Sequence, residues 1–318
     1  MQPPLATVVP SASCYTARAP SHWRRYLELT KPKVVALITF TALVGALLAE
    51  PGLPPLERLL WGILGIALAA GSAATLNHVL DRRIDAQMTR TRRRPLPTGQ
   101  LSTRNALTFA ALLGIAAVSM LAARVNLLTA VLTLLSLIGY AALYTLWLKH
   151  ATPQNIAIGG AAGAAPPVLG WAAVTGGVDA NALILFLIVF VWTPPHFWSL
   201  AIARRAEYAR ASIPMLPVTH GVDYTRRQIL LYTVLLVLAT LLPFATHMSG
   251  PIYLTCALCL DTIFLSYTLR LNLRGGEALA MRTFRFSVKY LMWLFAALLI
   301  DHYSMLPEVT PRLWDLVR

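Results

Sequence analysis

Nine runs of apolar residues, each long enough to cross a membrane as a helix, divide this chain of 318 residues. A helix needs roughly 20 such residues to span the hydrocarbon core of a bilayer. The runs are 34–49, 59–76, 106–123, 127–147, 155–175, 182–202, 229–246, 252–269 and 288–304. Only 13% of the residues are charged, whereas a soluble domain carries about 25%. We therefore expect an all-α polytopic membrane protein, with nine transmembrane helices in a bundle around a central cavity.

Lysine and arginine are unevenly distributed among the segments that join these runs. If the N-terminus is inside, 23 of the 27 basic residues lie on the cytoplasmic side. Nearly all of them lie in four segments: the one before the first run, the loops 78–105 and 203–228, and the segment 270–289. Cytoplasmic loops carry such an excess. We therefore expect the N-terminus and both loops in the cytoplasm and the C-terminus outside, across a bacterial inner (plasma) membrane. Topology also accounts for the net charge of +14 without a nucleic-acid partner.

The two ends of the chain differ in composition from the apolar body. Residues 1–22 are rich in Pro, Ser and Ala and lack the apolar core of a signal peptide, so we expect a disordered cytoplasmic tail. Residues 23–304 form the nine-helix domain, and 305–318 are an external C-terminal tail. Within the domain, glycine and proline crowd the run 155–175, which predicts a kinked helix packed tightly against its neighbours.

A dense group of charges follows the second run, from Asn77 to Gly99. It places an amide, two carboxylates and six arginines within 18 residues, directly after an uncharged apolar helix. If that helix continues, Asn77, Asp81 and Asp85 fall at i, i+4 and i+8, which places them on one face. The sequence therefore predicts a row of oxygen ligands with arginines beside it.

A similar pattern recurs about 120 residues later. Residues 81–85 (DRRID) and 94–97 (RPLP) are echoed by 203–207 (ARRAE) and 214–217 (PMLP). Because one loop follows the second run and the other follows the sixth, the pattern predicts a repeated four-helix unit with a ninth helix added. Such a pseudo-repeat would bring the two loops face to face at a shared site.

These residue types are suited to binding a diphosphate ester at a membrane surface. Mg²⁺ is usually bound by one or two carboxylates together with phosphate oxygens and water, which Asn77, Asp81 and Asp85 could satisfy, with Glu207 from the second loop. Arginine binds phosphate through two parallel hydrogen bonds and stays charged, so Arg90 and Arg94 are candidates to bind the diphosphate. The implied chemistry is metal-assisted loss of pyrophosphate, with an allylic cation captured by an electron-rich acceptor and a hydrocarbon tail held in an apolar cavity.

Several of these residues also have a purely structural interpretation. Four arginines of the loop could simply mark topology or bind anionic lipid: Arg82, Arg83, Arg92 and Arg93. The row Asn77, Asp81 and Asp85 could be an exposed polar helix end. His196 lies within the sixth run, where ionisable groups are often functional, but it could instead bond a carbonyl freed by Pro194 or Pro195. Asp261, in the eighth run, is either functional or bonded to another helix.

Several stretches of the chain match one family. They are 29–32 (LTKP), the Asn77/Asp81/Asp85 array, 88–99, 144–145 with Lys149, 152–156 (TPQNI), 159–167, 192–198 (WTPPHFW) and 213–217 (IPMLP). From about Leu29 to Tyr303 the chain resembles the haem-modifying branch of the UbiA-like intramembrane prenyltransferase superfamily. The array alone would indicate only the superfamily, whereas the last two stretches are typical of that branch.

The resemblance implies roles for particular residues. It assigns Mg²⁺, diphosphate binding and catalysis to the array Asn77, Asp81 and Asp85, and places basic residues near the phosphates: Lys149, Arg90 and Arg94. The family's second acidic motif commonly reads Asp-Asp/Glu-Tyr, whereas this chain has Ala206-Glu207-Tyr208, so Glu207 alone is expected to serve there. The candidate haem contacts are His196, Asn155 and Tyr208.

The activity implied by the resemblance is farnesyl transfer from farnesyl diphosphate to a vinyl group of protohaem IX. Water adds to give the side chain of haem O, which terminal oxidases use directly or as haem A. A downstream haem A synthase or oxidase assembly factor is a possible partner. Two alternatives stay open at this point: a prenyltransferase acting on a quinone precursor or chlorophyll-type acceptor, and a secondary transporter.

Overall fold

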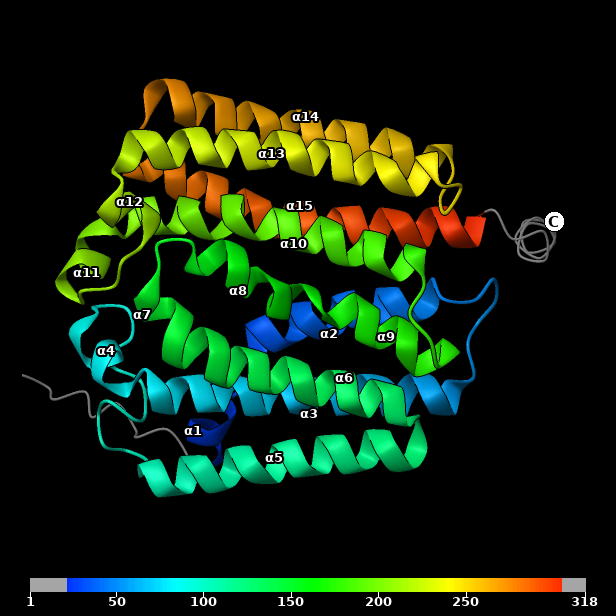
Figure 1. Ribbon diagram of the computed structural model, residues 1–318, viewed down its shortest axis with the longest axis horizontal. Helices are drawn as coiled ribbons and strands as arrows, with labels where there is room; N and C mark the ends of the chain where they lie inside the picture. The colour runs from blue at the N-terminus through cyan, green and yellow to red at the C-terminus, as the bar shows by residue number, and fades with distance from the viewer. Residues whose placement is uncertain (1–21, 305–318) are drawn as a thin grey trace, which may run out of the picture.

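The computed structural model describes residues 22–304, and every regular element in that range is a helix (Figure 1). The helices are α1 His22–Leu29, α2 Pro32–Leu47, α3 Leu56–Leu80, α4 Arg82–Gln87, α5 Thr103–Arg124, α6 Leu127–Ile138, η1 Gly139–Leu148, α7 Lys149–Ala151, α8 Asn155–Ala164, α9 Pro166–Thr175, α10 Ala180–Ala203, α11 Arg205–Arg210, α12 Leu216–Thr219, α13 Val222–Ala245, α14 Pro251–Arg274 and α15 Glu277–Ser304. The two predicted tails lie outside the described residues, apart from His22 at the start of α1.

The predicted membrane spans correspond to helices of the structure. Eight segments are long and apolar enough to cross a membrane, among them the joined pairs α6 with η1 and α8 with α9. The pair α1 and α2, bent by 50°, makes a ninth if it is counted as one span. The all-α membrane fold predicted from the apolar runs is therefore confirmed.

The short helices gather at one end of the bundle (Figure 1). The long helices run side by side, and α4, α7, α11 and α12 lie together at the left of the view. We call this the motif end, because it carries both predicted motif loops, 78–105 and 203–228. Their common location agrees with the charge pattern, whereas the side of the membrane that they face and the internal repeat both stay predictions.

Among the segments long enough to cross a membrane, α10 is the most buried, and it packs against α8, α9, α13 and α15. The glycine-rich fifth run is a broken span, α8 and α9, as its composition predicts. A Cβ atom built on Gly170 of α9 would lie 1.8 Å from the carbonyl oxygen of Ala42, and one on Gly45 would lie 2.1 Å from that of Pro167. Helices α2 and α9 therefore approach so closely that only glycine fits at these two positions.

Asp261 holds three helices together inside the bundle. Its carboxylate accepts a hydrogen bond from Thr240 Oγ1 of α13 at 2.8 Å and one from the Tyr290 hydroxyl of α15 at 2.5 Å. A buried polar group without partners is costly, and both oxygens of this one are bonded. The structure thus supports the interpretation of Asp261 as a residue bonded to other helices.

Candidate functional site

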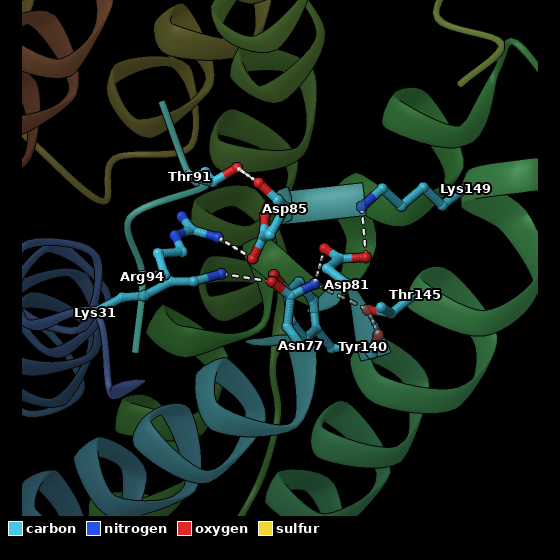
Figure 2. A network of polar contacts seen from close by, with 9 residues as sticks. All are labelled: Lys31, Asn77, Asp81, Asp85, Thr91, Arg94, Tyr140, Thr145 and Lys149. Atoms are coloured by element: carbon cyan, nitrogen blue, oxygen red, sulfur yellow. Dashed lines mark hydrogen bonds and ion pairs between the residues drawn. The ribbon is translucent and has the colours of Figure 1, made fainter. Parts of the chain in front are cut away.

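Asn77, Asp81 and Asp85 form a continuous row at the motif end of α3 (Figure 2). The helical hydrogen bonds run on from α3 into α4, since the Asp81 N–H donates to the Asn77 carbonyl at 2.9 Å and the Asp85 N–H to the Asp81 carbonyl at 2.8 Å. Asn77 Nδ2 donates to Asp81 Oδ2 at 3.0 Å. All three side chains are buried. The predicted shared face is confirmed, and we call these three side chains the carboxylate row.

Two basic side chains form ion pairs with the carboxylate row. Lys149 Nζ donates to Asp81 Oδ1 at 2.7 Å, and Arg94 donates to Asp85 Oδ2 at 2.7 Å. Both carboxylates are nearly enclosed, so these pairs are much less screened than surface ion pairs. The structure therefore brings Lys149 together with Asp81, Asp85 and Arg94, although Lys149 lies 68 residues after Asp81 in the chain.

The loop after α4 folds back so that Arg94 can reach the row. Thr91 Oγ1 donates to the Asp85 carbonyl at 3.0 Å, and the Arg94 N–H donates to the Thr91 carbonyl at 3.0 Å. These turns bring a residue nine positions later back beside Asp85. Lys149 comes from another part of the chain, immediately after η1.

Lys31 is a member of the site that the sequence did not single out. It lies in the break between α1 and α2, and its Nζ donates to Asn77 Oδ1 at 2.5 Å (Figure 2). Its backbone φ is 51°, in the left-handed region, which is uncommon for a residue other than glycine and often marks a functional position. The only sequence signal was its place in the matching stretch 29–32, directly before a membrane span.

The helix η1 places a further polar group against the row. Thr145 Oγ1 accepts from Asn77 Nδ2 at 3.4 Å and donates to the Tyr140 carbonyl at 2.8 Å. That bond spans five residues, as expected in η1, which is a π-helix. Single π-helical turns are rare and often occur at functional sites, and this longer π-helix lies directly beside the carboxylate row.

The other arginines of the first loop lie at its surface. Arg82, Arg83, Arg92 and Arg93 are exposed, which fits their interpretation as topology markers. Arg90 is also exposed.

Tyr208 links this loop to the second one. Burial raises the pKa of the Tyr208 hydroxyl, and the positive charge of Arg90 opposes that increase. Glu207 and Asp81 also influence this pKa, both raising it. The second loop therefore faces the first, as the sequence predicts.

Glu207 has one free carboxylate oxygen. Its Oε1 accepts from Arg204 at 2.9 Å, whereas Oε2 is buried with no hydrogen-bond partner among the described residues. Within residues 22–304, no three His, Cys, Asp or Glu side chains are grouped closely enough to hold a metal by themselves. A Mg²⁺ ion that also binds a diphosphate needs only one or two carboxylates, so the donors present fit such a complex: Asp81, Asp85, Asn77 Oδ1 and the free oxygen of Glu207.

His196 lies on α10, and Asn155 lies at the start of α8. His196 Nδ1 is 2.7 Å from Ser287 Oγ of α15. Asn155 is fully buried, and its Oδ1 has no partner among the described residues. Among the described residues, neither side chain forms a hydrogen bond with the row.

An apolar groove of about 460 Å³ lies along η1. It runs between α6 with η1 on one side and α8, α9 and the start of α10 on the other, from Tyr144 and Leu148 to Leu132 and Phe186. Tyr144 packs on Gly159, where an added Cβ would lie 2.2 Å from the ring. Tyr144, which lines the groove, directly precedes Thr145, whose side chain contacts Asn77.

Comparisons with known proteins identify relatives and structural neighbours. The model of the UbiA prenyltransferase family matches residues 38–296. The protoheme IX farnesyltransferase of Alkalilimnicola ehrlichii is 64% identical over 280 residues, which are 88% of this chain and 93% of that protein. The solved structure of a digeranylgeranylglyceryl phosphate synthase has a TM-score of 0.75 at 19% identity and covers 89% of this chain and 99% of its own. A UbiA homologue from Archaeoglobus fulgidus, bound to DMAPP and Mg²⁺, has a TM-score of 0.58 at 16% identity, with coverages of 86% and 99%. Both structures share the fold.

Proposed function

Since the chain belongs to the UbiA prenyltransferase family, we propose that it transfers the farnesyl group of farnesyl diphosphate to a vinyl group of protohaem IX. The observation that carries this proposal is the carboxylate row, in which an amide and two carboxylates are buried beside three basic side chains. The buried cluster of oxygen ligands and cations suits a diphosphate ester, and the apolar groove along η1 suits its hydrocarbon chain.

The choice of protohaem IX as acceptor rests on relatives. The Alkalilimnicola ehrlichii protein named protoheme IX farnesyltransferase shares 64% of its residues over most of both chains, which supports the same donor and acceptor here. The product would be haem O, and a haem A synthase or an oxidase assembly factor would take it next.

Mg²⁺ is the metal that we propose for the site, with Asn77, Asp81, Asp85 and Glu207 as its protein ligands. When bound, it would offset the charge of the diphosphate and so make it a better leaving group. The unpartnered Oε2 of Glu207 supports its place in this set. The choice of Mg²⁺ is supported by the Mg²⁺ bound to the structurally similar archaeal homologue.

We assign the basic side chains around the row to the phosphate oxygens. Lys149, Arg94 and Lys31 hold positive charge inside the site, and Arg90 adds to it at the exposed rim. The bond between farnesyl C1 and oxygen breaks with its electron pair on the diphosphate, where these cations stabilise the new charge. Of these cations we assign Lys149 to the catalytic group, together with the row and Glu207: Asn77, Asp81, Asp85, Glu207 and Lys149.

The acceptor side of the reaction uses haem carbon and water. A vinyl carbon of protohaem bonds to farnesyl C1, water adds to the cation left on the haem side chain, and the water then loses a proton. The apolar groove beside Tyr144 would hold the farnesyl chain and keep bulk water from the allylic cation. We propose His196, Asn155 and Tyr208 as haem contacts.

The acceptor can be tested in membranes that contain the wild-type protein. Incubation with farnesyl diphosphate and either haem b or 4-hydroxybenzoate, followed by mass analysis, should give farnesylated, hydrated haem and no prenylated benzoate. Prenylation of the benzoate without change to haem would instead indicate a quinone-type prenyltransferase.

A further inference from the structure

The hydrogen bonds around His196 select one form of its imidazole ring. The Ser287 hydroxyl donates to the Phe284 carbonyl at 2.7 Å, in the usual manner of a helical serine. A hydroxyl has a single hydrogen, and we assign that of Ser287 to the Phe284 carbonyl, so that Ser287 Oγ accepts from His196 Nδ1, which lies 2.7 Å away. The neutral ring then carries its hydrogen on Nδ1 and has a lone pair on Nε2.

Aromatic neighbours fix the orientation of this ring. The ring of Trp192 stacks on it with centroids 4.3 Å apart, and that of Phe284 packs against it at 4.6 Å. Trp192 is itself anchored, since its Nε1 donates to the Ser287 carbonyl at 2.9 Å. The imidazole is thus held between α10 and α15, and Nε2 has no hydrogen-bond partner among the described residues.

We propose that His196 Nε2 is an axial ligand to the iron of the haem substrate and that Ser287 is its positioning residue. The proposal rests on the function proposed above and gives it a way to orient a flat acceptor. Histidines that bind metal through one nitrogen generally donate the other N–H to an oxygen, which fixes the tautomer and raises the basicity of the ligand. The pair of His196 and Ser287 has this arrangement.

Two other roles for His196 explain less of the geometry. A role in helix support accounts for the bond between Nδ1 and Ser287 but gives no role to Nε2, which is unpaired among the described residues. A histidine that holds a haem propionate would need a hydrogen on Nε2, and the bond to Ser287 favours that hydrogen on Nδ1. Both roles can be separated from ligation, because neither depends on the iron.

The test compares haem b with iron-free protoporphyrin IX, both bound to the full-length protein in detergent. The wild type should give the absorption spectrum of histidine-ligated haem and should bind haem more tightly than protoporphyrin. His196→Ala should lose both features while binding protoporphyrin as the wild type does, and added imidazole should restore the spectrum. Ser287→Ala should keep the ligated spectrum but weaken haem binding by about 10-fold. His302→Ala is the matched control, because His302 lies at the other end of the bundle, where its ring nitrogen bonds the Glu50 carbonyl and its ring packs on Tyr303, and it should behave as the wild type.

Two results would overturn the proposal. One is a ligated spectrum that persists in His196→Ala, and the other is an equal loss of haem and protoporphyrin binding in that variant, which would indicate a propionate contact or a packing role. Elution as a single species checks that each variant is folded. Formation of haem O by the wild type is measured separately, so that ligation without transfer would count against the proposed function alone.

Discussion

Lys31 completes the set of charges around the carboxylate row. It bonds the amide of Asn77, while Lys149 and Arg94 bond the two carboxylates. Three cations therefore face two anions in a buried site, and the excess positive charge favours a polyanionic ligand. This balance suits a diphosphate better than it suits a neutral or cationic substrate.

Replacement of Lys31 by methionine should weaken binding of farnesyl diphosphate. A hydrogen bond to a charged group contributes about 1.5–3 kcal/mol, so KM for farnesyl diphosphate should rise by about 10- to 100-fold. KM for haem should not change. Lys33→Met is the control, because Lys33 lies two residues away, in the first turn of α2, and is exposed. Equal kinetics of the two variants would exclude Lys31 from the site.

Asp261 should matter for stability and not for transfer. Asp261→Ala leaves the Tyr290 hydroxyl without its buried acceptor, which should lower the free energy of unfolding by about 1–3 kcal/mol. Thermal unfolding in detergent would measure this, with Thr262→Ala as control, since Thr262 is exposed and bonds only within its own helix. If the folded variant lost transfer activity, our structural interpretation of Asp261 would be wrong.

Side chains on one helix could be placed from the sequence, whereas contacts between segments could not. Asn77, Asp81 and Asp85 share a face because of the helical period alone. The pairing of Lys149 with Asp81, across 68 residues, and that of Lys31 with Asn77, across 46 residues, depend on how helices pack. The family resemblance indicated Lys149 but gave Lys31 no role.

Two of the predicted runs are not regular α-helices throughout: one is interrupted between α8 and α9, and the other continues from α6 into η1. Glycine and proline predicted the break between α8 and α9, because both residues weaken a helix locally. The run that contains η1 has no such signal, and π-helical geometry is rare, so the sequence pattern gave no reason to expect it. The helix carrying Tyr144 and Thr145 was therefore predicted, but its geometry was not.

The close contact of α2 and α9 predicts that even a methyl group is harmful at Gly170. Gly170→Ala would place Cβ against the Ala42 backbone, which cannot move aside as a flexible side chain can. The resulting strain should cost about 1–3 kcal/mol, seen as a lower unfolding temperature. Gly163→Ala is the matched control, because nothing lies within 4 Å of its added Cβ. If the two variants melted together, the close approach of these helices would be disproved.

Two patterns in the sequence predicted the main features of the bundle. Apolar run length predicted the spans, and the distribution of Lys and Arg predicted which loops share an end, as Figure 1 shows. The internal repeat was inferred from short echoes in two loops, which are too weak to establish common ancestry of the two halves. The central site required the packed structure, because its residues come from α3, α4, η1 and the segments beside them.

The motif end should face the cytoplasm. In a cysteine-free background, Leu53→Cys lies in an exposed loop at the opposite end and Thr98→Cys lies in the exposed first motif loop. A membrane-impermeant maleimide should label the first variant in intact cells and the second only after permeabilisation. The reverse pattern would invert the orientation inferred from the charges.

Haem O formation by purified protein, with Mg²⁺ varied, tests whether the carboxylate row drives farnesyl transfer. We expect wild-type activity to disappear when EDTA removes the metal and to return when Mg²⁺ is added. Asp81→Asn keeps the shape of the side chain but removes its charge, and it should lower the rate by about 100-fold or more at any Mg²⁺ concentration. A rate for Asp81→Asn equal to that of the wild type, or haem O formation unaffected by EDTA, would contradict the proposed role of the row.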